Sequence, residues 1–574
     1  MLDNQRNMIL AIVLSALVLF GWSALSDRFF PTANPPATKT VQGKQVPVPN
    51  PGADPTADAP KALRDRALVL REGARVRIET PALAGSVNLT GARIDDLVLK
   101  RHTETIARNS APIRLLSPEG APGAIYAQFG WSGEGLQLPG NDTRWQADGQ
   151  LLAPGRPVTL TYANPSGQTF RIRLSIDANY MITADQSVAN AGAGPVAVRP
   201  FALVKRTGVS ADPDSWTVHT GPMGVFDGIA NYGVNFDDLD EAGQQGKSFT
   251  STGGWLGFTD KYWLTALAPA PGARVSASFR AIGDKTYLAA FTPADQTVLA
   301  PGRVATTTTR LFSGAKEVGV LQGYERDLDI AQFDKAIDWG WFAFFERPIF
   351  SLLHWLFRAV GNFGVAIILL TVIVRGLMFP IAQRQFASMA AMRSLQPKVK
   401  ALQERHKDDK QKLQQEMLEL YKKEKVNPFA GCLPILLQIP VFYALYKVLI
   451  LTVEMRHQPF ALWIRDLSAP DPLTPVNLFG LLDFTPPSFL ALGVLPILLG
   501  ITMWLQFKLN PAQPDPVQQQ VFAIMPWVFM FMMAPFAAGL QLYWTVSNIL
   551  AIAQQKFLYS RYPGLKNNPN TATT

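Results

Sequence analysis

Residues Asn362–Pro380 read NFGVAIILLTVIVRGLMFP, a segment apolar enough to enter a bilayer that nevertheless carries one full charge, Arg375. At 1.5 Å per helical residue, Arg375 lies roughly 18 Å beyond Phe363, past the middle of a hydrocarbon core about 30 Å thick. Arginine at that depth costs about 2.5–3.5 kcal/mol on insertion scales, so water, a partner group or a bound substrate must offset it. The competing interpretation is a span that ends early, with Arg375 extending to the lipid headgroups.

The composition of the chain indicates a membrane protein without enzymatic motifs. Strongly apolar segments alternate with polar ones, and the formal net charge of +9 comes from basic residues that cluster beside apolar runs. Basic residues in these places favour a role in orienting the protein in the membrane over a role in binding nucleic acid. One cysteine, Cys432, allows no intrachain disulfide, and five scattered histidines show no metal-ligand spacing. Because the sequence also lacks phosphate-loop, nucleophile-elbow and zinc-protease motifs, we predict no enzyme, no cofactor, no metal and no specific DNA partner.

The N-terminal region reads as an anchor followed by a tether. Met8–Leu25 is an apolar run of 18 residues that contains Trp22, which favours a retained transmembrane helix. A cleavable signal peptide is the alternative, with Ala24-Leu25-Ser26 as its small-residue cleavage site. The following stretch, Phe30–Pro60, is rich in Pro, Ala, Thr and Gly, which predicts an extended linker.

The stretch from Ala62 to Gly323 changes to short alternating runs separated by turn signals. Phe170–Ile176 alternates apolar and polar residues with period two, as a half-buried strand does. Many such runs predict a large antiparallel β-sandwich. We name no site in it; a sugar- or peptide-binding groove is the alternative to a purely structural role.

Two amphipathic segments flank the focal span. Residues Ile349–Phe357 form a broad apolar face with charged margins, which predicts an interfacial helix, or else a short re-entrant span. Between Arg384 and Lys425 there are eleven basic and six acidic residues, so the positive-inside rule places this segment in the cytoplasm. His406–Lys410 reads as the turn of an antiparallel helical hairpin. That hairpin is either simply solvated or a docking arm for something anionic, such as ribosomal RNA, or for an acidic protein surface.

Further apolar runs complete a predicted polytopic α-helical membrane protein with six spans, both termini in the cytoplasm and the all-β domain outside. The predicted divisions are an N-terminal transmembrane anchor (1–28), a flexible linker (29–61), the β domain (62–325), a linker with an interfacial helix (326–360), transmembrane helix 2 (361–382), the cytoplasmic hairpin (383–428), transmembrane helix 3 (429–453), a periplasmic loop (454–488), transmembrane helix 4 (489–507), a cytoplasmic loop (508–516), transmembrane helices 5 (517–534) and 6 (537–557), and a cytoplasmic tail (558–574).

Polar residues in the later spans give Arg375 its context. Thr371 lies one helical turn before it, Gln438 lies in the next span, and Gln541, Trp544 and Asn548 share a stripe of the last span. Interhelical hydrogen bonds explain the neutral residues. They do not explain a full charge, and the cores of the other spans offer no carboxylate. We therefore expect Arg375 to line a hydrated cavity that attracts an acidic or polar group.

Together these motifs resemble those of the YidC membrane protein insertases. The resemblance covers about Asp338–Tyr562 and consists of Thr371-x-x-x-Arg375, the charged hairpin, Asn427-Pro428-x-x-Gly431-Cys432-x-Pro434-x-x-x-Gln438-x-Pro440 and Gly539-x-x-Leu542-Tyr543-Trp544-x-x-Ser547-Asn548. The large β domain is similar to the periplasmic β-supersandwich of the Gram-negative type.

The resemblance implies a five-helix insertase core in the inner membrane that inserts and chaperones membrane proteins. It implies a groove that contains Arg375 and is closed toward the periplasm, with substrate contacts at Thr371, Gln438, Tyr543 and Trp544. It also implies the partners: nascent membrane proteins, the Sec translocon, the lipid bilayer, and the ribosome with the signal recognition particle receptor at the hairpin and tail. A transporter or channel in which Arg375 binds an anionic solute is the main alternative, although the sequence shows no internal repeat.

Overall fold

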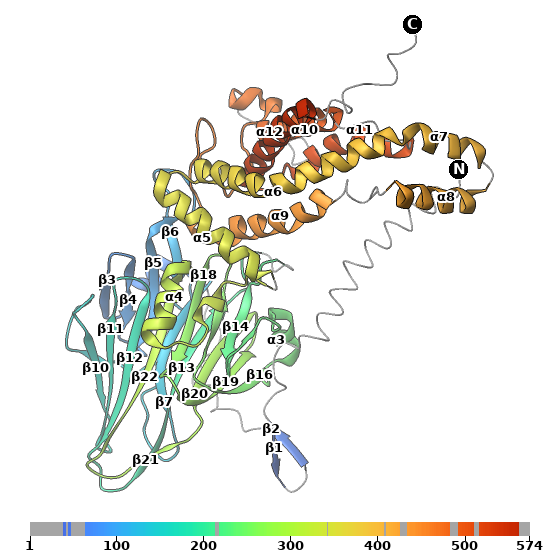
Figure 1. Ribbon diagram of the computed structural model, residues 1–574. Coiled ribbons are helices and arrows are strands. Elements are labelled where there is room, and N and C mark those ends of the chain that lie inside the picture. The colour runs from blue at the N-terminus through green and yellow to red at the C-terminus, as the bar shows by residue number, and fades with distance from the viewer. Residues whose placement is uncertain are drawn as a thin grey trace. The chain divides into compact units, whose positions relative to one another are not determined.

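The computed structural model describes residues 38–41, 44–47, 63–212, 217–340, 342–406, 409–424, 433–482, 492–509 and 516–561. They form two compact units that divide between Asp338 and Trp339, the first drawn mainly in blue and green and the second in yellow to red (Figure 1). The predicted N-terminal anchor, residues 1–28, lies outside the described residues. Part of the predicted linker forms strands: β1 (Thr38–Val41) and β2 (Lys44–Pro47) pair as an antiparallel hairpin, in keeping with their β-branched Thr and Val residues.

The first unit contains two large sheets. In spatial order, the nine-stranded sheet consists of β15 (Ile229–Asn231), β14 (Gly221–Phe226), β17 (Trp255–Thr259), β18 (Trp263–Pro269), β22 (Val304–Ala315), β12 (Met181–Asn190), β11 (Gln168–Ile176), β10 (Val158–Ala163) and β8 (Gln146–Ala147). The eleven-stranded sheet consists of β16 (Lys247–Thr252), β19 (Arg274–Ala281), β20 (Thr286–Pro293), β13 (Val196–Thr207), β7 (Ile125–Ser132), β5 (Arg93–Thr103), β4 (Leu83–Asn88), β3 (Arg75–Glu79) and β9 (Leu151–Leu152), with β21 (Thr297–Leu299) on β13 and β6 (Pro112–Leu116) on β5.

Strand alternation positions the core between these sheets. On β11, Phe170, Ile172 and Leu174 are buried while the arginines between them are exposed, as the period-two pattern predicts. Aromatic rings join the two sheets: Trp131 on β7 lies 5.1 Å from Phe170 on β11, centroid to centroid. Apart from the parallel β3–β9 pair, the described ladders are antiparallel. The predicted antiparallel β-sandwich is confirmed.

The sandwich extends further along the chain than its predicted end at residue 325. Helix α4 (Val318–Leu328) is held by Tyr324, whose hydroxyl donates to Asp177 Oδ2 at 2.5 Å. After it, η1 (Phe333–Ala336) places Phe333 5.2 Å from Phe312 and 5.4 Å from Trp255, centroid to centroid. The predicted linker therefore begins too early, because its first aromatic residues are part of the sandwich core. Two short helices, α2 (Arg66–Leu70) and α3 (Phe236–Ala242), complete the unit.

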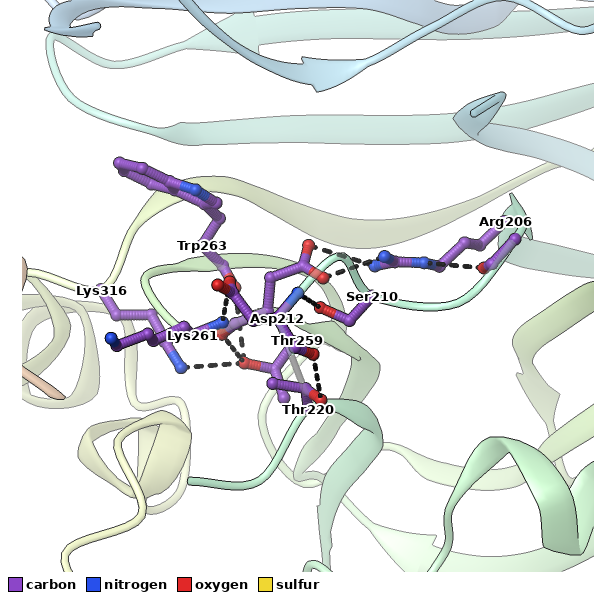
Figure 2. A network of polar contacts seen from close by, with 10 residues as sticks. Arg206, Ser210, Asp212, Thr220, Thr259, Lys261, Trp263 and Lys316 are labelled. Atoms are coloured by element: carbon purple, nitrogen blue, oxygen red, sulfur yellow. Dashed lines mark hydrogen bonds and ion pairs between the residues drawn. The ribbon is translucent and has the colours of Figure 1, made fainter. Parts of the chain in front are cut away.

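A buried network of charges lies beside the end of β22. The Lys316 ammonium donates to Thr259 Oγ1 at 3.0 Å and is 3% exposed, and the neighbouring Asp260 accepts two hydrogen bonds from Arg206 at 2.9 and 3.1 Å. Figure 2 shows Lys316 and Arg206 entering this network from opposite sides. Burial lowers the pKa of Lys316 to about 8, against the attraction of Asp260. Burial by itself would raise the pKa of Asp260, but the Arg206 guanidinium holds it below its ordinary value.

The second unit is helical. Its helices are α5 (Ala343–Val360), α6 (Phe363–Ser394), α7 (Gln396–Arg405), α8 (Lys410–Lys423), α9 (Leu433–Leu451), α10 (Val494–Leu509), α11 (Pro516–Met533) and α12 (Ala538–Arg561), with short turns η3 (Val453–Met455) and η4 (Pro475–Gly480) between α9 and α10. Lys398, near the start of α7, pairs with Glu424, just after α8, at 2.6 Å. These two helices therefore run antiparallel.

The focal span differs from its prediction at its end. Gly361, with φ 70°, ends α5, and Asn362 begins α6 by accepting a hydrogen bond from the Val365 backbone N–H at 3.1 Å. The predicted span ends at residue 382, but α6 continues through Pro380 to Ser394. Residues 381–394 are rich in Ala, Gln, Arg and Met, which favour helix, so the first part of the predicted hairpin is a continuation of this helix.

Within the described residues, one helix is long and apolar enough to cross a membrane by itself. It is Phe363–Arg384, which contains an 18-residue window with a mean hydropathy of 2.4, and 22% of that window is buried inside the protein. Gln438–Leu451, Val494–Leu509 and Gln520–Met533 are apolar but shorter. The count of six spans therefore stays a prediction. At its far end, α12 continues four residues beyond its predicted limit of 557 to Arg561.

The buried lysine predicts a pH dependence for the stability of the sandwich. Between pH 8 and 10.5, Lys316 is neutral in the folded protein but still protonated in the unfolded chain. The unfolded state then binds more protons, so the contribution of Lys316 to stability rises with pH through this window. We compare the free energy of unfolding of Lys316→Met with that of the parent, measured by urea unfolding of the full-length protein. As the pH rises from 8 to 10.5, the difference in favour of Lys316→Met should shrink by up to about 3 kcal/mol.

Lys285→Met is the matched control for this measurement. Lys285 pairs with Asp240 at the surface, and that hydrogen bond raises its pKa, so its titration lies above the window. If the free energies of unfolding of Lys316→Met and of the parent change in parallel from pH 7.5 to 10.5, the lowered pKa of Lys316 is contradicted.

Candidate functional site

Helix α12 is the central element of the helical unit. It packs against α6, α9 and α10, and most of its residues from Ala538 to Asn548 are buried. Three polar residues within a turn and a half of it, Tyr543, Ser547 and Asn548, each bond a different neighbouring helix. Most buried polar groups in proteins are hydrogen-bonded, and through these three bonds α12 is joined to α9, α6 and α10.

Arg375 reaches from α6 to α12. Its Nε and Nη2 donate to Ser547 Oγ at 2.9 and 2.6 Å, and Gln554 donates from its side-chain amide to the Arg375 backbone carbonyl at 3.3 Å. The Arg375 side chain is half-buried, whereas Ser547 is 2% exposed. Across the part of the chain that the structure describes, Arg375 belongs to no ion pair. A hydroxyl therefore meets the guanidinium but does not neutralise it.

Gln438 and Tyr543 form a second polar contact one turn away. The side-chain amide of Gln438, on α9, donates to the Tyr543 hydroxyl at 2.7 Å. Tyr543 and Ser547 are four residues apart and share a face of α12, so α9 and α6 bring their polar groups to the same stripe. Gln438 Oε1 is buried and finds no hydrogen-bond partner among the described residues, as expected at a position completed by water or a bound chain.

The other two predicted groove residues lie differently. Thr371 is fully buried, and its hydroxyl donates to the Ile367 carbonyl at 2.6 Å, within its own helix. Trp544 is half-buried between two aromatic rings, 4.5 Å from Phe442 on α9 and 4.5 Å from Phe529 on α11, centroid to centroid. Arg375 and Gln438 thus bond the same stripe of α12, whereas the Thr371 hydroxyl bonds within α6 and Trp544 packs between aromatic rings.

The remaining polar residues of α12 make structural contacts. Asn548 donates from its amide to Thr502 Oγ1 on α10 at 3.2 Å. The amide of Gln541 donates to three backbone carbonyls, those of Met533, Ala534 and Phe536, at 2.8–3.2 Å. It thereby satisfies carbonyls that the end of α11 leaves without helical partners. The sequence predicted that Gln541 and Asn548 make hydrogen bonds between structural elements, and the structure agrees with this prediction.

A covering loop, residues 456–473, lies across the starts of three helices. Phe460 accepts a hydrogen bond from the Asn362 amide at 2.8 Å at the start of α6, and a Cβ on Gly364 would lie 2.0 Å from its ring. The backbone N–H groups of Ala538 and Gly539, at the start of α12, donate to the Ala469 and Leu467 carbonyls at 2.8 and 2.9 Å. This loop closes one end of the bundle around α12.

Asp471 attaches the same loop to α10. Its carboxylate accepts hydrogen bonds from Trp463 Nε1 at 2.9 Å and from the backbone N–H groups of Leu473 and Leu495 at 3.0 and 2.7 Å. Leu495 belongs to the first turn of α10, where backbone N–H groups have no helical acceptor and attract negative charge. Gly493 makes room for the carboxylate, since a Cβ there would lie 2.7–2.9 Å from it.

Besides Asp471, sequence reasoning missed two further buried charged residues of this unit. Lys447, on α9, is 2% exposed, and Glu346, in the first turn of α5, is fully buried. Both helices meet through Phe342 and Tyr443, whose rings lie 5.4 Å apart, centroid to centroid. Lys447 stands within an apolar run and could have been recognised by the same reasoning that singled out Arg375. The burial of Glu346 depends on helix packing and has no signal in the sequence.

Comparison with known proteins identifies the family. Residues 75–352 match the YidC periplasmic domain, and residues 355–566 match the 60Kd inner membrane protein. A membrane protein insertase YidC from Zymomonas mobilis is 51% identical over 560 residues, covering 97% of this chain and 96% of that protein. The chain belongs to the YidC membrane protein insertase family. The Methylorubrum extorquens insertase YidC is 46% identical over 594 residues, with 98% and 96% of the two chains covered.

Membership in the YidC family bears on the fold and on the question of an enzyme. It confirms the prediction of a β-sandwich periplasmic domain followed by a helical region. It also confirms the prediction that the protein is not an enzyme, because the family is one of membrane protein insertases. Among solved structures, an active YidC insertase with its first transmembrane domain resolved matches at 18% identity and a TM-score of 0.35, over 84% of this chain and 92% of that one. A putative aldose 1-epimerase from Escherichia coli K12 matches 42% of the chain at 13% identity and a TM-score of 0.28, which supports no activity.

Asp471 should be a stability determinant of the helical unit. Asp471→Ala leaves three donors without their acceptor, and each buried donor left unsatisfied costs about 1–3 kcal/mol. We expect a lower thermal unfolding temperature in detergent and faster proteolysis within residues 456–473. Asp466→Ala is the control, because the polar partners of Asp466 among the described residues, Ser468 and His457, both belong to the loop itself. Equal effects of the two substitutions would contradict the role of Asp471.

Proposed function

We propose that this protein inserts membrane proteins into the inner membrane of a Gram-negative bacterium and helps them to fold, alone or with the Sec translocon. Family membership and relatives named as insertases over nearly their full length support this activity. The further proposal is the means: a hydrophilic groove beside α12 that contains Arg375.

The observation that carries the groove is the Arg375–Ser547 contact. A guanidinium at roughly 18 Å along an apolar helix is met by one hydroxyl and by no carboxylate among the described residues. A neutral partner such as the Ser547 hydroxyl offsets part of the cost of burying the guanidinium. The positive charge of Arg375 then still attracts an incoming acidic or polar group. The orphaned Gln438 Oε1 one turn away supports hydration of the same stripe.

Insertion then follows from the free energy of transfer. A nascent chain enters with its polar leading segment beside Arg375, Gln438 and Tyr543, where hydrogen bonds and water lower the cost of holding polar groups at membrane depth. The apolar segment moves past Trp544 and the aromatic residues of α9 and α11 into lipid. Removing its surface from water drives the step, so no nucleotide hydrolysis is needed.

The proposed topology places both termini and the α7–α8 hairpin in the cytoplasm. The eleven basic and six acidic residues between Arg384 and Lys425 support this orientation through the positive-inside rule. We propose that the hairpin and the tail receive the ribosome and the signal recognition particle receptor. On the other side of the membrane, the covering loop closes the groove toward the periplasm.

A solute transporter or channel with an anion at Arg375 is the second candidate. The unneutralised guanidinium is equally suited to a small anion, so the two functions share this observation. Anion flux through reconstituted vesicles that contain the protein and no client would favour the transporter.

Replacing Arg375 should impair insertion selectively. Charge-assisted hydrogen bonds contribute about 1.5–3 kcal/mol, so Arg375→Ala should slow insertion of clients with acidic translocated tails by about ten- to a hundredfold. Arg375→Lys should retain more activity, because it keeps the charge but loses the two-nitrogen contact with Ser547. The measurement is protease protection of translocated tails in reconstituted vesicles. Arg384→Ala, at an exposed position of the same helix, is the matched control. Unchanged insertion by a folded Arg375→Ala protein would exclude the proposed role.

Client chains should pass the polar stripe closely enough to be captured. A photo-reactive residue at position 438, 543 or 544 should form adducts with a stalled nascent chain, and one at Val298 in the β unit, which is 69% exposed, should form far fewer. Adducts from position 371 would show whether the buried Thr371 is reached when a client is present. The readout is the mass shift of the radiolabelled chain. Equal yields from position 298 and from the groove positions would argue against the groove.

A further inference from the structure

A short apolar tip follows the covering loop. It comprises residues 475–482, PVNLFGLL, in which Val476, Leu478, Phe479, Leu481 and Leu482 are between 41% and 84% exposed. Residues 472–482 contain no ionisable side chain, and the nearest charged residues along the chain are Asp471 and Asp483. Five exposed large apolar residues within seven positions form an interaction surface rather than an ordinary solvated loop.

The tip is an ordered turn. Leu478 and Phe479 both adopt left-handed backbone conformations, with φ 51° and 59°, which bulky residues rarely take. Backbone hydrogen bonds hold it: Phe479 N–H donates to the Thr474 carbonyl at 2.9 Å, and Leu482 N–H donates to the Asn477 carbonyl at 3.1 Å. The turn therefore presents apolar side chains outward while its backbone groups bond one another, as an environment poor in water requires.

The base of the tip lies at the start of α10. The Val494 N–H, at the first residue of α10, donates to the Leu473 carbonyl at 3.0 Å, and the Leu495 N–H donates to Asp471 at 2.7 Å. The tip begins two residues after Leu473. It therefore leaves the protein where α10 begins, and α10 itself exposes Leu498 and Ile501 a turn further on.

We propose that the apolar tip inserts into the outer leaflet of the bilayer and that its partner is phospholipid. The argument is continuity: the exposed apolar surface of α10 faces lipid if α10 spans the membrane, and the tip, whose own residues carry no charge, starts beside the first residue of α10. Insertion would attach the covering loop, and through Asp471 the start of α10, to the membrane surface. The proposal rests on the topology under the proposed function but not on the insertion mechanism.

Fluorescence of a single labelled cysteine tests this proposal in the full-length protein. Cys432→Ser removes the native cysteine, and Leu481→Cys, at the most exposed position of the tip, takes an environment-sensitive nitrobenzoxadiazole label. In vesicles of phosphatidylethanolamine and phosphatidylglycerol without any client, we expect blue-shifted emission, quenching by lipids carrying a shallow doxyl group, and loss of most quenching by aqueous iodide. Val298→Cys, on β21, is the matched exposed apolar control and should keep iodide quenching.

Each other outcome overturns the proposal. Iodide quenching at position 481 equal to that at position 298 shows a tip in water. A blue shift that appears only when a client chain is added shows a client-binding surface. A blue shift that is lost when the protein is diluted in lipid shows contact with a second copy. Phe479→Cys gives an independent second reading. Because no client is present in the main experiment, failure of the groove mechanism would leave this result unaffected.

Discussion

The hydrogen bonds between Arg375 and Ser547 are the contact on which the helical unit depends. A charge in the middle of an apolar helix needs a polar neighbour, and the neighbour of Arg375 comes from another helix. Ser547 supplies that neighbour from α12. Once this pair is made, α12 must lie against α6 with its polar stripe turned inward, which also brings Tyr543 to Gln438 and Asn548 to Thr502. One contact thus determines the orientation of the central helix toward three others.

The covering loop accepts hydrogen bonds from the starts of helices at one end of the bundle. Helix starts leave backbone N–H groups without acceptors, and in this protein three such starts lie under one loop. Asp471 makes the central contact, because its carboxylate accepts hydrogen bonds from the Trp463 side chain of the loop and from the Leu495 backbone N–H of α10. Gly364 and Gly493 are required by the same packing, since Phe460 and Asp471 occupy the space that their side chains would take. The loop is therefore as specific a part of the unit as the helices.

The β unit contains its own core and its own buried charges. Aromatic contacts join the two sheets, and Arg206, Asp260 and Lys316 form a network that hydrogen bonds satisfy in part. Such networks are weak evidence for stability and require no ligand. The family assignment rests on both units.

The sequence by itself determined the classes of structure and the position of the anomaly. Period-two alternation predicted β11 and the sandwich, and hydropathy located the apolar helices, because both depend only on local pattern. The end of α6 is the exception, since this helix continues twelve residues beyond its predicted limit of 382. Arg375 stood out because its charge violates the local rule for membrane helices. Only the tertiary structure decided that Ser547 is its partner, that Thr371 bonds within its own helix, that Trp544 lies between Phe442 and Phe529, and that Glu346 is buried. Those facts depend on which faces of distant helices meet, and side chains separated by up to 172 positions in the chain leave no periodic trace of their contact.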